Sequence, residues 1–292
     1  MARCLASFPL TAVDVSDCSN LEGLKIYPLY RIGAEPGNLI GTLNSDNQKR
    51  LARPKTMLIS LIIPTYNERQ NIAIVIERAT RALERALDHF EIIVVDDDSP
   101  DGTWQAVEEL AADNAHVRVI RRLGNKGLAT AVVTGWQAAR GNLLGVMDGD
   151  LQHPPEVLPV LLRSILDSQA DIVIASRNVE GGGVSEWRPI RRLIAGGARS
   201  IAVLIIPGVL KNVRDPMSGY FFMKRAVIES VSLKPVGYKI LLEVLARGKY
   251  QTVLEVPYIF EERKTGQSKL GAKQCIDFFI HLSRLARDFG RI

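Results

Sequence analysis

The sequence predicts an α/β fold with a mostly parallel central sheet and helices on both of its faces. From Met57 onward, short apolar runs alternate with amphipathic segments, as strands and helices do when they take turns along a chain. Several of the apolar runs lead directly into acidic or polar motifs. Parallel strands expose their carboxyl ends at one edge of a sheet, and ligands of such folds bind there. We therefore expect the functional residues to follow the strands.

Five strands and four helices are expected in order. The strands cover residues 58–63, 91–95, 117–120, 142–147 and 171–175. The helices cover residues 69–87, 103–112, 128–139 and 156–168. Five such strands make a doubly wound, nucleotide-binding core.

Residues 1–56 are expected to form a poorly ordered N-terminal extension that adds no strand to the sheet. They lack the periodicity of the later chain and end in a basic run at 49–55. The opening apolar run is too short for a signal peptide. Met57 is an alternative natural start of translation.

The composition argues against several classes of function. A net charge of +5 over 292 residues is too diffuse to indicate a nucleic-acid-binding protein. Cys4, Cys18 and Cys275 lack the spacing of a disulfide framework or zinc site, which fits a reducing cytoplasm. The phosphate loop of nucleotide kinases and the Gly-x-Gly-x-x-Gly turn of dehydrogenases are both missing after the first strand.

Two carboxylates and an amide follow the fourth expected strand, in the run Asp148-Gly149-Asp150-Leu151-Gln152. Hard oxygen ligands suit Mg2+ or Mn2+, and such an ion would neutralise the charge that develops on a leaving diphosphate. The alternative is an ordinary turn or helix cap, the commoner role of two Asp that flank a Gly.

Three further loops lie at the same edge. The loop at 64–68 offers the aromatic face of Tyr66 and the carboxylate of Glu68 to a base and ribose. The loop at 96–103 offers Asp97 as a hydrogen-bond acceptor, with a turn and helix cap as the alternative. In the loop at 124–128, Lys126 either lies near phosphate or is solvated.

These motifs together resemble the dolichol-phosphate (polyprenol-phosphate) mannosyltransferases, which are inverting family 2 glycosyltransferases. The likeness continues through Asp215-Pro216-Met217-Ser218-Gly219-Tyr220-Phe221, Gly237-Tyr238-Lys239-Ile240-Leu241-Leu242-Glu243, Glu255-Val256-Pro257 and residues 263–270. It covers residues 57–272 in unbroken order and implies a catalytic domain of the GT-A fold there.

The resemblance also implies roles for single residues. The positions for the nucleotide sugar and the metal fall on Pro64, Tyr66, Glu68, Val95, Asp97, Asp148, Gly149, Asp150, Arg263 and Lys269. The metal ligands among the family's residues match Asp148, Asp150 and Gln152, and the arginines that hold the acceptor phosphate match Arg177 and Arg191. Asp150, Arg177 and Arg191 are thus the expected catalytic residues. Gly149 departs from the family, which usually has Ala between the two aspartates; the ligands stay usable, although the loop gains freedom.

The activity implied by the resemblance is transfer of mannose from GDP-mannose to a polyprenyl or dolichyl phosphate. The acceptor is already anionic at neutral pH, so it attacks without a catalytic base, and a single displacement gives a β-linked product. Arginine forks would orient the incoming phosphate. The alternative for Arg177 is a surface salt bridge.

A lipid acceptor implies a membrane partner. Residues 193–213 are too interrupted to span a bilayer and are expected to be interfacial. Residues 273–292 are expected to form a basic amphipathic helix whose stripe of Phe278, Leu282, Leu285 and Phe289 lies on anionic lipid or packs on the core. Related enzymes often continue into transmembrane helices. The chain is therefore either a catalytic subunit, peripheral on the cytoplasmic face and paired with a small membrane-anchoring subunit, or a sequence that ends before such helices.

Two other functions remain open at this stage. A polyprenol-phosphate glucosyltransferase that uses UDP-glucose shares the first motifs. A non-catalytic nucleotide-sugar-binding subunit could keep the fold, although the intact set of Asp148, Asp150, Gln152, Arg263 and Lys269 argues against it. None of the four histidines has the spacing of a metal or catalytic site.

Overall fold

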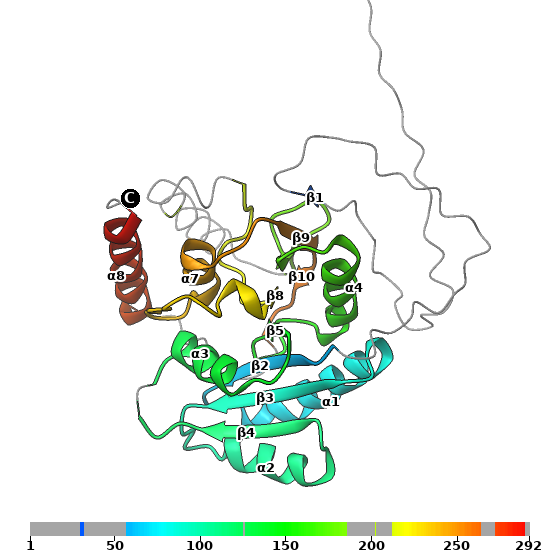
Figure 1. The fold of residues 1–292 in the computed structure, drawn as a ribbon. Coiled ribbons are helices and arrows are strands. Elements are labelled where there is room, and N and C mark those ends of the chain that lie inside the picture. Colours follow the sequence, from blue (N-terminus) through cyan, green and yellow to red (C-terminus); the bar gives the residue numbers. More distant parts are fainter. Residues whose placement is uncertain are drawn as a thin grey trace, which may run out of the picture.

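The fold is built around one eight-stranded sheet with helices on both faces (Figure 1). A computed structural model describes residues 30–31, 57–124, 126–185, 202, 212–263 and 272–289. The strand order is β1-β9-β6-β8-β5-β2-β3-β4. The α/β class and the mostly parallel sheet expected from the sequence are confirmed.

The first half of the sheet follows the predicted alternation closely. Its elements are β2 (Ile59–Thr65), α1 (Arg69–Ala86), β3 (Phe90–Asp96), α2 (Thr103–Asp113), β4 (Val117–Arg121), α3 (Leu128–Ala138) and β5 (Leu143–Val146). Strand β2 pairs in parallel with both β3 and β5, and β3 pairs in parallel with β4. The carboxyl ends of these four strands therefore meet at one edge.

The second half contains a reversed strand that the sequence analysis did not predict. Its elements are η1 (Pro155–Val157), α4 (Leu158–Ser168), β6 (Ile172–Ser176), β7 (Gly183–Val184), β8 (Phe221–Lys224), η2 (Arg225–Val227), α7 (Ile240–Arg247), β9 (Val253–Pro257), β10 (Ile259–Phe260) and α8 (Ala272–Phe289). Strand β8 lies between β5 and β6 and runs antiparallel to both. Its Phe222 covers Gly145 of β5, where an added Cβ would lie 2.4 Å from the ring, so this glycine admits the aromatic side chain.

One expectation about the N-terminal extension is wrong. Tyr30 and Arg31 form the short strand β1, which pairs antiparallel with Glu255 and Leu254 of β9 at the edge of the sheet. The extension therefore does contribute to the sheet, although only at these two residues within the described part of the chain. The rest of residues 1–56 lies outside the described residues.

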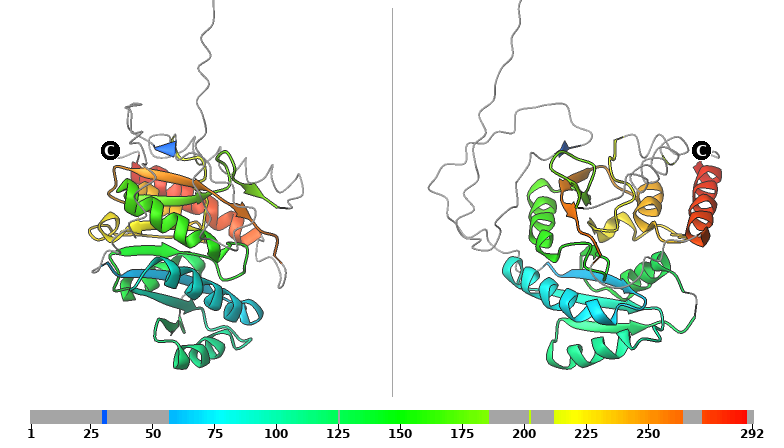
Figure 2. Two further views of the ribbon diagram at one scale, coloured as in Figure 1. Left: turned by 90° about the vertical axis from the view of Figure 1, so that its right-hand side faces the viewer. Right: turned by 180° about the vertical axis from the view of Figure 1, so that it is seen from behind.

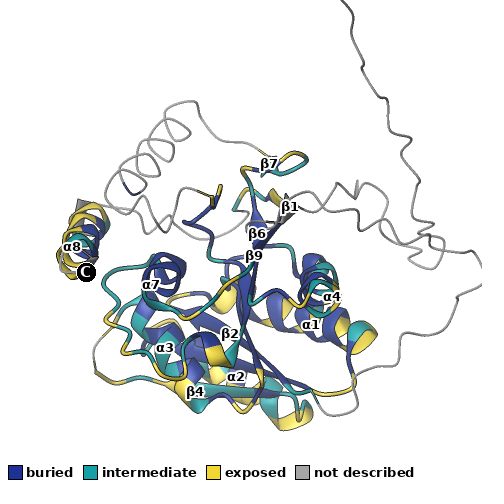
Figure 3. Cartoon of the chain, turned by 45° about the horizontal axis from the view of Figure 1, so that its top comes forward, coloured by how far each residue is buried: buried dark blue, intermediate teal, exposed yellow. Residues whose placement is uncertain are grey.

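Two hydrophobic layers sandwich the sheet, as the period of two along a strand requires. Ile59, Leu61 and Ile63 of β2 face a layer that includes α1, α2 and α4. Ile62, between them, faces the layer that includes α3, α7 and α8. Figure 2 shows the helices from two further sides, and Figure 3 shows how completely the central strands are buried.

The last helix packs on the core through the predicted stripe. Phe278, Leu282 and Leu285 of α8 are buried and belong to the layer of α3 and α7. Of the two roles left open for the stripe, core packing is therefore the one that the structure shows. None of the helices in the described part of the chain is long and apolar enough to cross a membrane.

Candidate active site

The two aspartates after β5 form an acidic pair at the carboxyl edge of the sheet. Burial and the nearby Asp150 carboxylate raise the pKa of Asp148 to about 7. Its Oδ1 atom is buried and accepts no hydrogen bond from any residue that the structure describes. Two carboxylates held together, one of them with an unsatisfied oxygen, are a donor set that a divalent cation stabilises.

The loop of this pair is shaped by contacts that Gln152 makes. Leu151 takes a positive φ of 62°, and the Gln152 backbone N–H donates to Asp150 Oδ1 at 3.1 Å. The Gln152 side-chain amide donates to the Glu261 carbonyl at 3.1 Å, and the Glu261 N–H donates back to the Gln152 carbonyl at 3.0 Å. No cluster of three or more His, Cys, Asp or Glu suited to a metal occurs among the described residues. Gln152 as a third ligand therefore stays a prediction.

Arg263 reaches the acidic pair from the segment that follows β10. Its Nη2 lies 2.5 Å from Asp150 Oδ2 and 3.5 Å from Glu68 Oε1. Asp150 is separated from Arg263 by 113 residues, and Glu68 by 195. The structure thus brings together three residues that the resemblance assigned to one site.

Hydrogen bonds join the loop after β2 to the loop after β3, both of which lie beside the acidic pair. The Asn67 N–H donates to Ser99 Oγ at 2.9 Å, and the Glu68 N–H donates to Thr103 Oγ1 at 3.0 Å. The ring of Tyr66 is 38% exposed at this edge, and Lys126 Nζ lies 5.3 Å from its centroid. Lys126 is exposed, as its solvated alternative expected, and its position near phosphate stays a prediction.

The other predicted nucleotide residues differ in what they present. Pro64 and Val95 are paired across β2 and β3, and Val95 is fully buried, so only its backbone is available to a ligand. The Asp97 carboxylate is nearly buried and accepts from the Arg122 guanidinium and from the Gly127 N–H. Asp101 Oδ1 accepts from the Thr103 N–H at 3.0 Å, so the predicted turn before α2 is present, but the N-cap of α2 is Gly102, which makes no side-chain cap bond.

His153 supports the acidic pair rather than titrating beside it. Its Nδ1 accepts from the Asp148 N–H at 3.1 Å, and its ring stacks on Tyr220 at 5.1 Å. Burial lowers the pKa of His153 to about 3, so the ring is neutral. A Cβ on Gly219 would lie 3.1 Å from Asp148 Oδ2 and 3.2 Å from His153 Cε1. Any larger residue at this position would push Asp148 or His153 away by a few tenths of an ångström.

Arg177 forms a salt bridge, as its alternative expected, but the pair is largely buried rather than at the surface. Its Nε and Nη2 each donate to the Asp215 carboxylate at 2.8 Å, and its backbone N–H donates at 3.0 Å. The side chains of Arg177 and Asp215 are 15% and 1% exposed. Burial would raise the pKa of Asp215, but the hydrogen bonds and charge of Arg177 lower it. Glu255 in turn accepts from the backbone N–H of Asp215 at 2.9 Å.

The model of glycosyl transferase family 2 matches residues 60–232. The chain belongs to glycosyltransferase family 2. The matched range contains the acidic pair, the loop at 64–68, Asp97 and Arg177. The family predicted from the sequence motifs is therefore confirmed.

Two relatives within family 2 carry more specific names. A dolichol-phosphate mannosyltransferase from Pyrococcus furiosus is 45% identical over 236 residues, which are 81% of this chain and 66% of that protein. A polyprenol monophosphomannose synthase from Mycolicibacterium smegmatis is 38% identical over 72% of this chain and 80% of its own length. The chain thus spans just under two thirds of the length of the first relative.

A solved structure with a similar fold supports this architecture. Glucosyl-3-phosphoglycerate synthase from Mycobacterium tuberculosis, solved with Mn2+, UDP-glucose and phosphoglyceric acid, aligns with a TM-score of 0.58 and 19% identity. The alignment covers 80% of both chains. The GT-A glycosyltransferase fold predicted from the sequence is confirmed by this similarity.

Some predicted residues lie outside the described part of the chain. These are Arg191, Lys269 and all of 193–213 except Ala202, Asn212 and Val213. Three further residues have structural roles that were not predicted from the sequence: His153 supports the acidic pair, Asp215 is the partner of Arg177, and Arg122 is the partner of Asp97. Asp215 lies in the DPMSGY motif and His153 directly follows the run from Asp148 to Gln152, whereas nothing in the sequence signalled Arg122.

Proposed function

We propose that this family 2 glycosyltransferase transfers mannose from GDP-mannose to the phosphate of a polyprenol or dolichol. The observation that carries the proposal is the meeting of Asp148, Asp150, Glu68 and Arg263 at the carboxyl edge of the sheet. The names of the two relatives supply the sugar and the acceptor class.

A divalent cation, Mg2+ or Mn2+, fits the donor set of this site. Asp148 and Asp150 would hold it, with Gln152 as the third ligand, and the unsatisfied Oδ1 of Asp148 is the atom that argues for it. When bound, the ion neutralises negative charge on the departing diphosphate. The solved neighbour with Mn2+ supports this choice of metal.

The donor nucleotide would lie along the loops after β2 and β3. Tyr66 offers a ring face, Glu68 and Asp97 offer acceptors, and Pro64 and Val95 contribute backbone. Arg263, which neutralises Asp150 and Glu68 in the structure described, would turn to the diphosphate together with Lys269 when the donor binds.

The acceptor phosphate would be held by Arg177 and Arg191. A phosphate monoester is anionic at neutral pH, so the reaction needs orientation and charge stabilisation rather than a general base. The surroundings of His153 agree with this, because its neutral ring is enclosed by Tyr220, Tyr258 and Phe260. Inversion at the sugar would give a β-linked polyprenyl phosphate mannose.

The acceptor lipid requires a membrane surface, and α8 offers a second apolar face for it. Ile276, Phe279 and Ile280 are 59%, 52% and 40% exposed, on the side of α8 away from the core. Arg284 and Arg287 are exposed on the same helix. We assign this face to the cytoplasmic surface of an anionic bilayer, because apolar side chains flanked by arginines complement such a surface. A small membrane-anchoring subunit is the other partner that this face could bind.

The test is transfer from two labelled donors, GDP-mannose and UDP-glucose, to a polyprenyl phosphate in the presence of Mn2+. We expect mannose transfer that a chelator abolishes and that Asp150→Ala abolishes without unfolding the protein. Asp113→Ala, at the end of α2, is the matched control and should stay fully active. Transfer from UDP-glucose alone would overturn the choice of donor, and donor binding without any turnover would indicate a non-catalytic subunit.

A further inference from the structure

Arg122, just after β4, connects three segments at the nucleotide end of the sheet. Its Nε donates to Asp97 Oδ1 at 2.6 Å, and its Nη2 also pairs with that oxygen. Its Nη1 donates to Thr130 Oγ1 at 3.1 Å, and Nη2 donates to the Gly127 carbonyl at 3.1 Å. One guanidinium thus holds together the end of β3, the turn before α3 and the first turn of α3.

Asp97 completes this arrangement from the other side. Its Oδ2 accepts from the Gly127 N–H at 2.6 Å, so both carboxylate oxygens are engaged. The side chains of Arg122 and Asp97 are only 11% and 7% exposed. Thr130 Oγ1 also donates to the Gly127 carbonyl at 2.8 Å. We refer to Asp97, Arg122, Gly127 and Thr130 as the Asp97 clamp.

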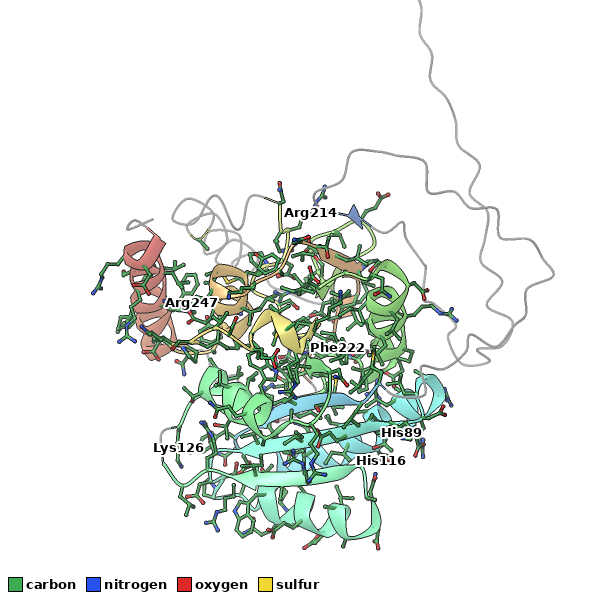
Figure 4. The ribbon with its side chains drawn as sticks, in the orientation of Figure 1. His89, His116, Lys126, Arg214, Phe222 and Arg247 are labelled. Carbon is green, nitrogen blue, oxygen red and sulfur yellow. The ribbon has the colours of Figure 1, made fainter. Side chains whose placement is uncertain are left out.

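The Asp97 clamp fixes the residue that directly precedes Gly127. Lys126 Nζ lies 5.3 Å from the Tyr66 ring centroid and 3.5 Å from the Asp98 carbonyl oxygen. Figure 4 shows Lys126 on the loop that leads into α3. A cation at this distance from a ring interacts favourably with its π face. The clamp therefore holds the backbone next to this exposed lysine, from which its ammonium group reaches the aromatic side chain at the nucleotide end.

We propose that Arg122 is a positioning residue for the donor nucleotide. It touches no substrate, but through Asp97 and Gly127 it holds Lys126 against Tyr66 and so sets the affinity for the nucleoside diphosphate. The inference rests on the proposed function, because that function places the nucleotide at Tyr66 and Asp97. It adds two residues, Arg122 and Lys126, to which neither the sequence motifs nor the family likeness gave a role in holding the base or ribose.

The chain supplies a matched control four residues earlier. Arg118 of β4 donates through Nε to Glu91 Oε2 at 3.1 Å and through Nη2 to the Ala138 carbonyl at 2.6 Å. It therefore ties β3 to the helix α3, as Arg122 does. Glu91 stands near the start of β3, however, so this second link lies at the end of the sheet opposite the nucleotide site.

The experiment compares the binding of GDP and of UDP, each measured by calorimetry with Mn2+, in four variants and the wild type. The variants are Arg122→Gln, Arg118→Gln, Lys126→Ala and the double variant Arg122→Gln/Lys126→Ala. We expect Arg122→Gln to weaken binding of the cognate nucleotide about tenfold, the effect of losing one charge-assisted contact. Arg118→Gln should lower the melting temperature about as much as Arg122→Gln does. It should leave the nucleotide affinity within about twofold of the wild type.

The double variant shows whether Arg122 acts on the nucleotide through Lys126 or whether its loss only destabilises the fold. If Arg122 acts through Lys126, the double variant should bind the nucleotide no more weakly than whichever of Arg122→Gln and Lys126→Ala has the lower affinity. In transfer assays, the KM for the donor should rise in Arg122→Gln while kcat stays unchanged. Arg122→Lys should restore part of the affinity, because it keeps the charge but loses the fork.

Several outcomes would overturn the inference: unchanged affinity in Arg122→Gln, equal losses in Arg122→Gln and Arg118→Gln, or additive losses in the double variant. A wild type that binds neither nucleotide would overturn it together with the proposed function. A wild type that binds GDP but transfers no mannose would overturn the proposed function alone, and the binding data would still decide the role of Arg122. If Arg122→Gln does not fold, Thr130→Val removes one of its acceptors and should weaken binding about threefold, and no change there would likewise contradict the inference.

Discussion

An alanine substitution at Arg177 would affect both protein stability and the proposed binding of the acceptor phosphate. Arg177 neutralises the buried carboxylate of Asp215, and we propose that it also holds the acceptor phosphate. Removing one partner of a buried ion pair typically costs about 3–5 kcal/mol of stability, because the other charge stays buried without compensation. Arg177→Ala would therefore lose activity through unfolding even if Arg177 never met the acceptor.

Arg177→Lys separates the two roles. Lysine keeps a positive charge beside Asp215 but loses the planar fork that holds a phosphate with two hydrogen bonds. We expect the transfer rate to polyprenyl phosphate to fall about tenfold while the dissociation constant of GDP changes less than about twofold. Arg225→Lys is the control, because the side chain of Arg225 donates only to the backbone carbonyls of Ala139 and Gly141 among the contacts described. Equal losses in rate and GDP affinity would instead place Arg177 on the nucleotide.

The sequence predicted the charged residues that meet at the carboxyl edge of the sheet but not the partners that fix them. Asp148, Asp150, Glu68 and Arg263 were assigned through ordered motifs, and the structure brings them together. The partners of Arg177 and Asp97 lie 38 and 25 residues away along the chain. Such pairs depend on which strands become neighbours, and no local spacing records that.

The contact between helices α7 and α8 is organised by one fully buried carboxylate. Glu243 of α7 accepts from Arg247 Nε at 2.7 Å and from the Lys234 N–H at 2.6 Å. Its Oε2 lies 2.8 Å from His281 Nε2 of α8, and Arg247 also reaches Asp288 of α8. Burial opposes ionisation of Glu243, but these hydrogen bonds outweigh it and hold its pKa below the usual value. The ionised form of Glu243 therefore stabilises the packing of α8 against α7.

Glu243→Gln tests this through its pH dependence. A carboxyl group whose pKa is lowered in the folded protein stabilises it above the pKa of the unfolded chain, about 4.3, and stops doing so as the pH falls through the folded value. We expect the variant to lose about 2–3 kcal/mol of unfolding free energy at pH 7 and the difference to shrink below about pH 4. Denaturant unfolding at several pH values measures it. Glu84→Gln, on the exposed face of α1, should show no difference, and a pH-independent loss in Glu243→Gln would refute the argument.

Strands with a helix on either side were predictable, and the others were not. Strands β2 to β6 are short apolar runs that alternate with amphipathic helices, so the period of each segment identified it. Strand β8 has only four residues and follows the motif around Asp215 without a helix in between, and it runs antiparallel. Strand β1 has two residues and gains its pairing only from the exposed edge of β9. Length and local pattern could not reveal either of them.

At the level of the whole molecule, β1 changes what removal of the N-terminal extension should do. Removing residues 1–56 takes β1 away from the edge of β9, whereas removing residues 1–28 leaves it in place. We expect the shorter deletion to be neutral and the longer one to lower the melting temperature by about 2–4 °C, which corresponds to about 1 kcal/mol in a protein of this size. GDP affinity should be unchanged in both, because the proposed nucleotide site lies at the carboxyl ends of β2, β3 and β5. Loss of affinity in the longer deletion alone would make the extension part of that site.

The outward face of α8 is the surface that we propose binds the membrane carrying the lipid acceptor. Replacing Ile276, Phe279 and Ile280 together by Ser removes apolar area that is already exposed, so the fold should keep its melting temperature. If each side chain contributes about 1 kcal/mol on entering the bilayer interface, binding to vesicles with anionic lipid should weaken about a hundredfold. Co-sedimentation measures this, and transfer to a short, water-soluble polyprenyl phosphate should stay at the wild-type rate. Ile74→Ser is the control, since Ile74 is 46% exposed on α1 and lies away from the proposed membrane face.

Unaltered vesicle binding in the triple variant would move the membrane contact to another surface. Loss of transfer to the short acceptor would instead show that this face serves the active site directly.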